Sequence, residues 1–317
     1  MAKQFSYGGQ AVMEGVMMRG KKHYSIAVRK ETGEITTITK TLSTTLSGRV
    51  RKIPLLRGIL ALIETLIIGV KSLMYSADMF MGEEAKDMKG KSWIMGFSMT
   101  LGIILALGLF IGIPLALTEY VVKPHVPSNV LVNVANGLIR LVIIIGYMYV
   151  IGLLPDVRRV FCYHGAEHKT INALEDGAPL EVAEVQKYGT AHPRCGTSFL
   201  LIVMVLAIVA YMFIPRTGIL QRFSYQLVIL PAVAAVSYEI IRITARYHTN
   251  PIVKLILMPG MFVQSITTKQ PDDQQVEVGI TALKTAMAAD GDLVIEEVDT
   301  MTSDTIESTQ ISDKRDE

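Results

Sequence analysis

Long blocks of apolar residues constrain this chain more than any other feature of its sequence. Half of its 317 residues are hydrophobic, and many of them gather in stretches that contain few charged side chains. About 20 apolar residues in a helix cross a hydrocarbon core of roughly 30 Å. Four stretches approach this length and predict membrane-spanning helices, at 94–121, 130–154, 199–214 and 225–241.

Residues 53–77 are also apolar, but they carry three charged side chains at intervals of seven: Arg57, Glu64 and Lys71. Seven residues make nearly two helical turns, so the three side chains lie in one stripe. The stripe favours an amphipathic helix that lies on the membrane surface or packs against it. A re-entrant or spanning segment is the alternative.

The distribution of basic residues orients the predicted spans. The region 1–91 contains 15 Lys and Arg against 8 Asp and Glu, and the loop at 155–198 contains five Lys and Arg. The links at 122–129 and 215–224 contain only three together. Because basic residues accumulate on the cytoplasmic side, we expect both termini and the 155–198 loop in the cytoplasm. The basic N-terminal half suits anionic lipids, and it lacks the interleaved aromatic residues of a nucleic-acid surface.

The N-terminal region is polar and rich in strand-forming residues. Residues 24–30 and 35–42 flank a short segment that contains a glycine, which predicts a β-hairpin. The Gly-rich stretch at 8–15 lacks the Lys-Ser/Thr pair of a phosphate-binding loop, so it predicts no nucleotide site.

The 155–198 loop concentrates the residues that carry chemistry, since it holds three of the six His and both Cys. His164, Glu167 and His168 form H-x-x-E-H, the inverted zinc-hydrolase motif. On a helix, residues four apart share a face, so two imidazoles can bind one metal. The glutamate next to the second histidine can then act as general base toward water. Two Cys in a chain this long do not make a disulfide framework.

A catalytic zinc site needs a third protein ligand and keeps a fourth position open. Glu239 is one candidate, because an acid at the end of the last span is costly unless it pairs or functions. An ion pair with a nearby arginine such as Arg242 is the alternative. His192 and Cys195, spaced as H-x-x-C before the third span, offer another pair of ligands, with capping and packing as the alternative. His248 completes the candidates.

Four longer stretches carry a resemblance to a known family. They are GGQAVMEGVMMRG at 8–20, HGAEHK at 164–169, HPRCGTSF at 192–199 and YEIIR at 238–242. The chain resembles the YqhQ-like family of bacterial membrane proteins over nearly its whole length, down to QPDD at 270–273. That family is described as a predicted metal-dependent enzyme with no assigned reaction. The resemblance therefore implies a metal site and also a role for Glu14, which periodicity and spacing do not show.

The leading functional prediction is a zinc-type, metal-dependent hydrolase at the cytoplasmic surface of the membrane. His164 and His168 serve as ligands, Glu167 is the base, and the third ligand comes from the candidates above. The substrate class stays open between a peptide, a lipid and a small hydrophobic metabolite.

The alternative prediction is a non-catalytic, metal-responsive membrane scaffold or a transport-related protein. Arg140 favours it, because an arginine deep in a predicted span often marks a pathway. A structural ion pair with an acid of another helix, such as Glu64, is the plainer interpretation of Arg140.

In fold class the sequence predicts an all-α integral membrane bundle of about four transmembrane helices with a small β-containing N-terminal cytoplasmic region. The lipid bilayer is the expected partner, nucleic acid is not, and a homo-oligomer is left open. The expected segments are a β-rich region at 1–52, an amphipathic helix and linker at 53–91, a transmembrane hairpin at 92–154, the cytoplasmic loop at 155–198, a second hairpin at 199–242, a cytoplasmic interfacial and helical segment at 243–298, and a disordered acidic tail at 299–317.

Overall fold

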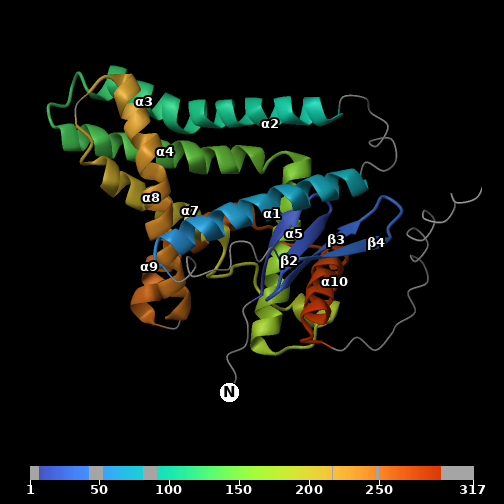
Figure 1. The fold of residues 1–317 in the computed structure, drawn as a ribbon. Helices are drawn as coiled ribbons and strands as arrows, with labels where there is room; N and C mark the ends of the chain where they lie inside the picture. Colours follow the sequence, from blue (N-terminus) through green and yellow to red (C-terminus); the bar gives the residue numbers. More distant parts are fainter. Residues whose placement is uncertain (1–6, 43–52, 81–90, 216, 248–249, 294–317) are drawn as a thin grey trace, which may run out of the picture.

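The computed structural model describes residues 7–42, 53–80, 91–215, 217–247 and 250–293. Figure 1 shows a small sheet with helices packed against it, beside a set of long apolar helices. The strands are β1 (Gly8–Val12), β2 (Gly15–Arg19), β3 (His23–Arg29) and β4 (Ile35–Thr41). The longer helices are α1 (Leu56–Phe80), α2 (Lys91–Leu107), α4 (Asn129–Ile151), α5 (Pro155–Asp176), α7 (Gly196–Tyr211), α8 (Ile219–Arg246), α9 (Pro251–Thr267) and α10 (Asp273–Asp290). Shorter helical segments are η4 (Gly108–Gly112), α3 (Ile113–Leu117), η5 (Thr118–Val122) and α6 (Val182–Val185).

The four strands form an antiparallel meander in the order β1-β2-β3-β4. Only Met13 and Glu14 connect β1 to β2, and Glu14 adopts a φ of 49°, the left-handed conformation that such a tight turn needs. Strands β3 and β4 confirm the predicted hairpin, with each boundary within one residue of expectation. Gly33 provides the positive φ in the turn between them.

Helices cover both faces of this sheet, because successive side chains of a strand point to opposite sides. Val16 and Met18 of β2 pack with residues of α5 and α10. Met17, on the other face, belongs to a cluster that includes Ile68 of α1. The N-terminal strands are therefore the middle layer of a three-layer unit, with α1 on one side and α5 and α10 on the other (Figure 1).

Four described helical stretches are long and apolar enough to cross a membrane: Leu56–Phe80, Gly96–Val122, Asn129–Ile151 and Ile219–Thr244. The number matches the prediction, but the members differ. Helix α7 has 16 residues and rises about 24 Å at 1.5 Å per residue, which is shorter than a roughly 30 Å core. Helix α1 meets the length criterion in its place, although it also packs along the sheet.

The charged stripe of α1 explains this packing. Glu64 is buried and forms an ion pair of 2.7 Å with Arg19 of β2. Lys71, two turns further on, is exposed. The sequence interpretation that paired Arg140 with Glu64 is wrong, because Arg140 of α4 instead donates a 2.6 Å hydrogen bond to Gln226 of α8.

The helix predicted at 274–289 is α10, which begins in a capping box made by Asp272 and Gln275. It packs on the sheet and completes its core. The interfacial segment predicted at 252–266 corresponds to helix α9. The disordered tail predicted at 299–317 lies outside the described residues.

Candidate metal centre

The two histidines of the motif lie on α5, a 22-residue helix that fills much of the segment expected as a loop at 155–198. His164 and His168 are one turn apart, and their ring centroids are 4.5 Å apart. Gly165 lies between them in the sequence, and the backbone of Lys269 passes very close to it. A Cβ atom at Gly165 would collide with the carbonyl oxygen of Lys269. The missing side chain lets the segment after α9 pass directly against the motif.

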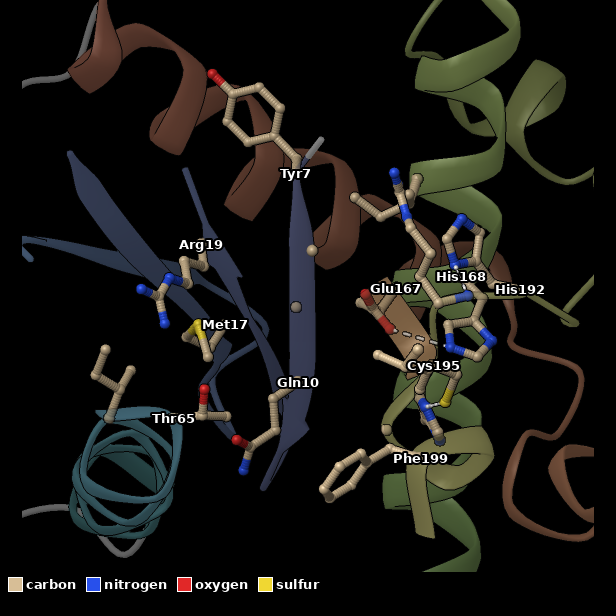
Figure 2. A pocket seen from close by; sticks show the side chains of 18 of the residues that line it. Tyr7, Gln10, Met17, Arg19, Thr65, Glu167, His168, His192, Cys195 and Phe199 are labelled. Carbon is tan, nitrogen blue, oxygen red and sulfur yellow. Dashed lines mark hydrogen bonds and ion pairs between the residues drawn. The ribbon is translucent and has the colours of Figure 1, made fainter. Parts of the chain in front are cut away.

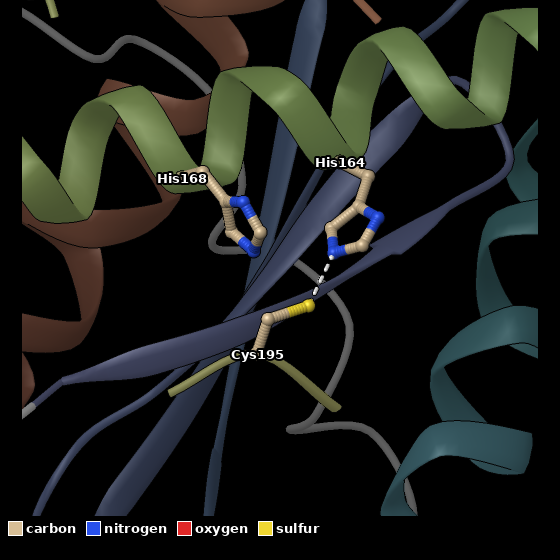
Figure 3. Close-up of side chains that lie close together, drawn as sticks. All are labelled: His164, His168 and Cys195. Atoms are coloured by element: carbon tan, nitrogen blue, oxygen red, sulfur yellow. Dashed lines mark hydrogen bonds between the residues drawn. The ribbon is translucent and has the colours of Figure 1, made fainter. Parts of the chain in front are cut away.

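Cys195 brings a sulfur atom to the two histidines from the N-cap of α7, as Figure 3 shows. Its Sγ atom lies 3.2 Å from Nε2 of His164. One ligand atom from each of the three residues lies within 4.8 Å of the other two. Ligand atoms in a tetrahedral zinc site lie roughly 3.3–3.6 Å apart, given Zn–N and Zn–S distances of about 2.0 and 2.3 Å. Within the described part of the chain, this is the single group of three such residues that converges so closely.

Backbone carbonyls fix both imidazoles in one orientation. Nδ1 of His164 lies 3.0 Å from the carbonyl oxygen of Thr267, and Nδ1 of His168 lies 2.6 Å from that of Thr190. A carbonyl oxygen only accepts, so Nδ1 carries the proton in each ring, and Nε2 of the neutral ring keeps its lone pair. Such an outer hydrogen bond is the usual support of a histidine that binds metal through its other nitrogen.

Lys169 supports the loop that carries Thr190. Its Nζ atom donates hydrogen bonds of 2.7 Å to the carbonyl oxygens of Gln186 and Tyr188. The side chain is buried, and burial lowers the pKa of its ammonium group. The residue that follows the H-x-x-E-H motif thus holds a part of its outer shell.

A backbone N–H group and the N-terminus of α7 lie beside the sulfur of Cys195. The backbone N–H of Thr197 points at Sγ from 3.4 Å, within the first turn of α7. The N-terminus of a helix carries partial positive charge, and the thiolate is the form of cysteine that binds metal.

Glu167 projects into the same space and is buried. One of its carboxylate oxygens lies 3.5 Å from Nε2 of His168, the contact drawn in Figure 2. A Cβ atom at Gly9 of β1 would lie 2.7 Å from Cγ of Glu167, so a glycine in the first strand leaves room for this side chain. The carboxylate therefore stands beside the three ligand atoms without belonging to their group.

All four groups line one cavity of about 420 Å³. Figure 2 shows that β1 and α1 form the side opposite the histidines. Apolar side chains make much of the wall, and they come from both the sheet unit and the long helices. Among them are Met17, Leu62, Ile68, Phe199 and Ile241.

His192 lies next to this group but is otherwise engaged. Its ring centroid is 5.7 Å from that of His168. Its Nε2 atom lies 3.4 Å from a carboxylate oxygen of Glu175, and its Nδ1 atom accepts a 3.3 Å hydrogen bond from the backbone of Arg194. The structure therefore places His192 as a buried neighbour, outside the converging ligand set.

Glu239 does not join the group either. Both of its carboxylate oxygens accept from the guanidinium of Arg57, one of them at 2.7 Å. An ion pair had been the alternative to ligation, but its partner is on α1 rather than the neighbouring Arg242. His248, the remaining candidate, lies outside the described residues.

The role of Glu14 could not be read from spacing. Its carboxylate accepts from Nε of Arg159 at 2.6 Å and from the hydroxyl of Tyr163 at 3.2 Å. Both partners are on α5, Arg159 five residues before His164 and Tyr163 directly before it. Glu14 thus fastens the first turn of the sheet to the helix that carries the two candidate histidine ligands.

Residues 53–289 match the model of the family described as DUF1385, protein of unknown function. The chain belongs to this family. It is also 34% identical, over 288 residues, to the uncharacterized protein YqhQ of Bacillus subtilis (strain 168). The alignment covers 87% of this chain and 90% of that relative, which confirms the resemblance to the YqhQ-like family. No solved structure matches the chain. The DUF1385 match includes all four residues of the candidate centre: His164, Glu167, His168 and Cys195.

Proposed function

We propose that this protein is a metal-dependent hydrolase that works at the cytoplasmic surface of the cell membrane. The observation that carries the proposal is the convergence of His164, His168 and Cys195 beside the buried carboxylate of Glu167, all facing one cavity. Two imidazoles and one thiolate suit Zn²⁺, and three protein ligands leave a position open for chemistry.

A divalent metal held there would supply Lewis-acid activation of water or of a carbonyl group. The protein's own groups divide the remaining work. Glu167 accepts a proton from water and returns it to the leaving group. Thr267 and Thr190 keep the two rings oriented through their carbonyl oxygens. The apolar wall of the cavity limits the access of bulk water.

The position of the cavity supports work at a membrane. It lies between the sheet unit and residues of α1, α7 and α8, and α8 contains one of the four stretches able to cross a bilayer. Leu66 and Ile63 of α1 are exposed on the helix that covers the sheet. We infer that α1 lies along the membrane surface, because a spanning α1 would carry the sheet into the hydrocarbon.

Metal content per chain tests the proposal without a substrate. Untagged protein, purified without chelator, should carry about one equivalent of metal, and His164→Ala or Cys195→Ala should lower that content strongly. His125→Ala is the matched control, since this exposed histidine is remote from the cavity lining. Elemental analysis that finds no metal in the unmodified protein would end the proposal.

The alternative, a transport-related protein, draws support from the polar interior of the long helices. Arg140 is buried and lies 5.1 Å above the ring of Tyr211. Arg222 is also buried and bonds to Glu119 at 3.0 Å. These buried polar side chains reach α8 at Gln226, which accepts from Arg140. Gln226 lies about 18 Å along α8 from Tyr238, a residue that lines the cavity beside the candidate metal centre. Uptake of a radiolabelled ion or solute into vesicles, abolished by Arg140→Met, would favour transport.

A further inference from the structure

A second hollow opens next to the candidate metal centre. It has a volume of about 380 Å³ and shares Arg19, Ala61, Thr65 and Tyr238 with the first cavity. The two hollows are therefore neighbouring parts of one depression. Whereas the first is largely apolar, the second is lined by three arginines, namely Arg19, Arg57 and Arg242, together with Glu64.

The charges of this second hollow do not cancel. Arg19 pairs with Glu64 at 2.7 Å, and Arg57 pairs with Glu239. Among the described residues, no carboxylate lies within ion-pair distance of Arg242, which is itself exposed. Three guanidinium groups thus face two carboxylates, which leaves one positive charge at the rim. Arginine is well suited to phosphate and carboxylate, because its planar fork donates two parallel hydrogen bonds.

Two of the arginines, Arg57 and Arg242, lie near the ends of apolar helices. Arg57 is in the first turn of α1, and Arg242 is in the last turns of α8, close to the end of its apolar stretch Ile219–Thr244. Their neighbours Leu56 and Ile243 are 45% and 57% exposed. Exposed apolar side chains beside cations are typical of the boundary between hydrocarbon and headgroups.

The first cavity continues from the arginines toward the candidate metal centre along an apolar wall. Leu62 and Ile68 of α1 line it, as do Phe199 and Ile241 of the long helices. A ligand that fills both hollows needs an anionic end and an apolar end. A free anion would leave this wall uncovered, and a neutral lipid would offer no negative charge to Arg242.

We propose that the two hollows bind one anionic membrane lipid, with its headgroup at Arg19, Arg57 and Arg242 and an acyl chain beside the metal centre. The inference rests on the proposed hydrolase for its meaning, since it names that enzyme's substrate class. The headgroup–chain linkage of such a lipid lies between the arginines and Glu167.

Lipid retention by the delipidated full chain tests this site. Native mass spectrometry from a neutral detergent would compare phosphatidylglycerol with phosphatidylcholine of the same acyl chains. We expect the first bound equivalent to favour phosphatidylglycerol about fivefold. Arg242→Gln should remove most of that preference, and Arg242→Lys should keep part of it. Arg158→Gln, at an exposed arginine of α5 outside both hollows, is the matched control and should change nothing.

Equal retention of the two lipids by the wild type, or an unchanged preference in Arg242→Gln, would overturn the inference. Inorganic phosphate that binds as tightly as the lipid would assign the site to a free anion and would equally overturn it. Unchanged elution and unfolding temperature establish that Arg242→Gln is folded. His168→Ala separates the two proposals, because it should lower the metal content and leave the lipid preference in place. If the wild type prefers the anionic lipid but holds no metal, the hydrolase proposal alone is contradicted. If it holds metal but shows no lipid preference, the lipid site alone is contradicted.

Discussion

The Sγ atom of Cys195 lies 3.2 Å from Nε2 of His164, although 31 residues separate them in the sequence. The contact joins the N-terminus of α7 to the middle of α5, so it depends on how the long helices meet the sheet unit. It also extends a two-histidine motif to a set of three candidate ligands.

Cys195 should react with a thiol reagent only after its metal is removed. A coordinated thiolate is shielded, so alkylation in purified protein should be slow and should speed up at least about tenfold with chelator. Cys162 is an internal control, because it lies outside the ligand group and burial raises the pKa of its thiol. Peptide mapping by mass spectrometry distinguishes the two. If Cys195 is labelled equally fast with and without chelator, it does not belong to the ligand set.

Glu167→Gln should keep the metal and lose activity. The three ligand atoms remain, whereas general-base catalysis typically supplies about 10²–10⁴-fold in rate. Glu239→Gln should also keep the metal, because its carboxylate is held by Arg57 and lies outside the ligand group. Elemental analysis of both variants gives the readout before any substrate is known. Loss of metal from Glu239→Gln alone would restore Glu239 as the third ligand.

Local patterns predicted those parts of the fold that local physics decides. The β3–β4 hairpin follows from strand-forming residues around a glycine turn, and α10 follows from helical periodicity behind the cap at Asp272. The H-x-x-E-H spacing gave His164 and His168 because four residues make about one helical turn. Whether a metal occupies them stays a prediction.

The sequence could not show which distant residue joins the two histidines as a candidate ligand. His192, Cys195 and Glu239 were equivalent as candidate ligands, since each depends on contacts between separate elements. Of these three, the structure brings only Cys195 into the group, whereas Glu239 of α8 pairs with Arg57 of α1. Gly165 offered a signal that was missed, because a glycine inside a helix often marks a close approach of another backbone.

Asp290 should make folding stability fall at acidic pH. Its carboxylate is buried, which opposes ionisation, but it accepts from the His23 ring at 2.8 Å and from the backbone of Lys22 at 3.0 Å. These hydrogen bonds hold its pKa below 3.8 in the folded state. A lowered folded pKa means that the stabilisation is present above the unfolded value and is lost as pH falls through the folded one.

Asp290→Asn should therefore lower the unfolding free energy by about 1–3 kcal/mol at neutral pH. The difference from the wild type should shrink below about pH 4. Chemical denaturation in chelator, from pH 3 to 7, measures the profile without a contribution from metal. A difference that stays constant over this range would exclude Asp290 as the titrating group.

Glu14→Gln should loosen the attachment of the sheet to α5. The hydrogen bond with Glu14 raises the pKa of Arg159, and the charge is lost in the variant. Arg159 is half exposed, so we expect a loss of only about 0.5–1.5 kcal/mol. Glu34→Gln is the control, because its pair with Lys30 lies on the surface. Equal effects of the two substitutions in thermal unfolding would mean that Glu14 is an ordinary surface acid.

Gly165→Ala should weaken metal binding without touching a ligand. The added Cβ meets the backbone carbonyl of Lys269, so α5 and the segment after α9 must move apart. That movement takes the carbonyl of Thr267 away from Nδ1 of His164, and loss of such an outer hydrogen bond typically costs about 10–100-fold in metal affinity. Gly196→Ala is the control, since this glycine adjoins Cys195 but has open space around it.

Competition with a fluorescent zinc chelator would measure both affinities. We expect a clear loss in Gly165→Ala and a wild-type value in Gly196→Ala. Overpacking also costs roughly 1–3 kcal/mol of stability, so circular dichroism must first establish that the alanine variant is folded at the assay temperature. A folded Gly165→Ala protein with undiminished affinity would show that the Thr267 carbonyl is dispensable. The orientation of the His164 ring would then come from α5 itself.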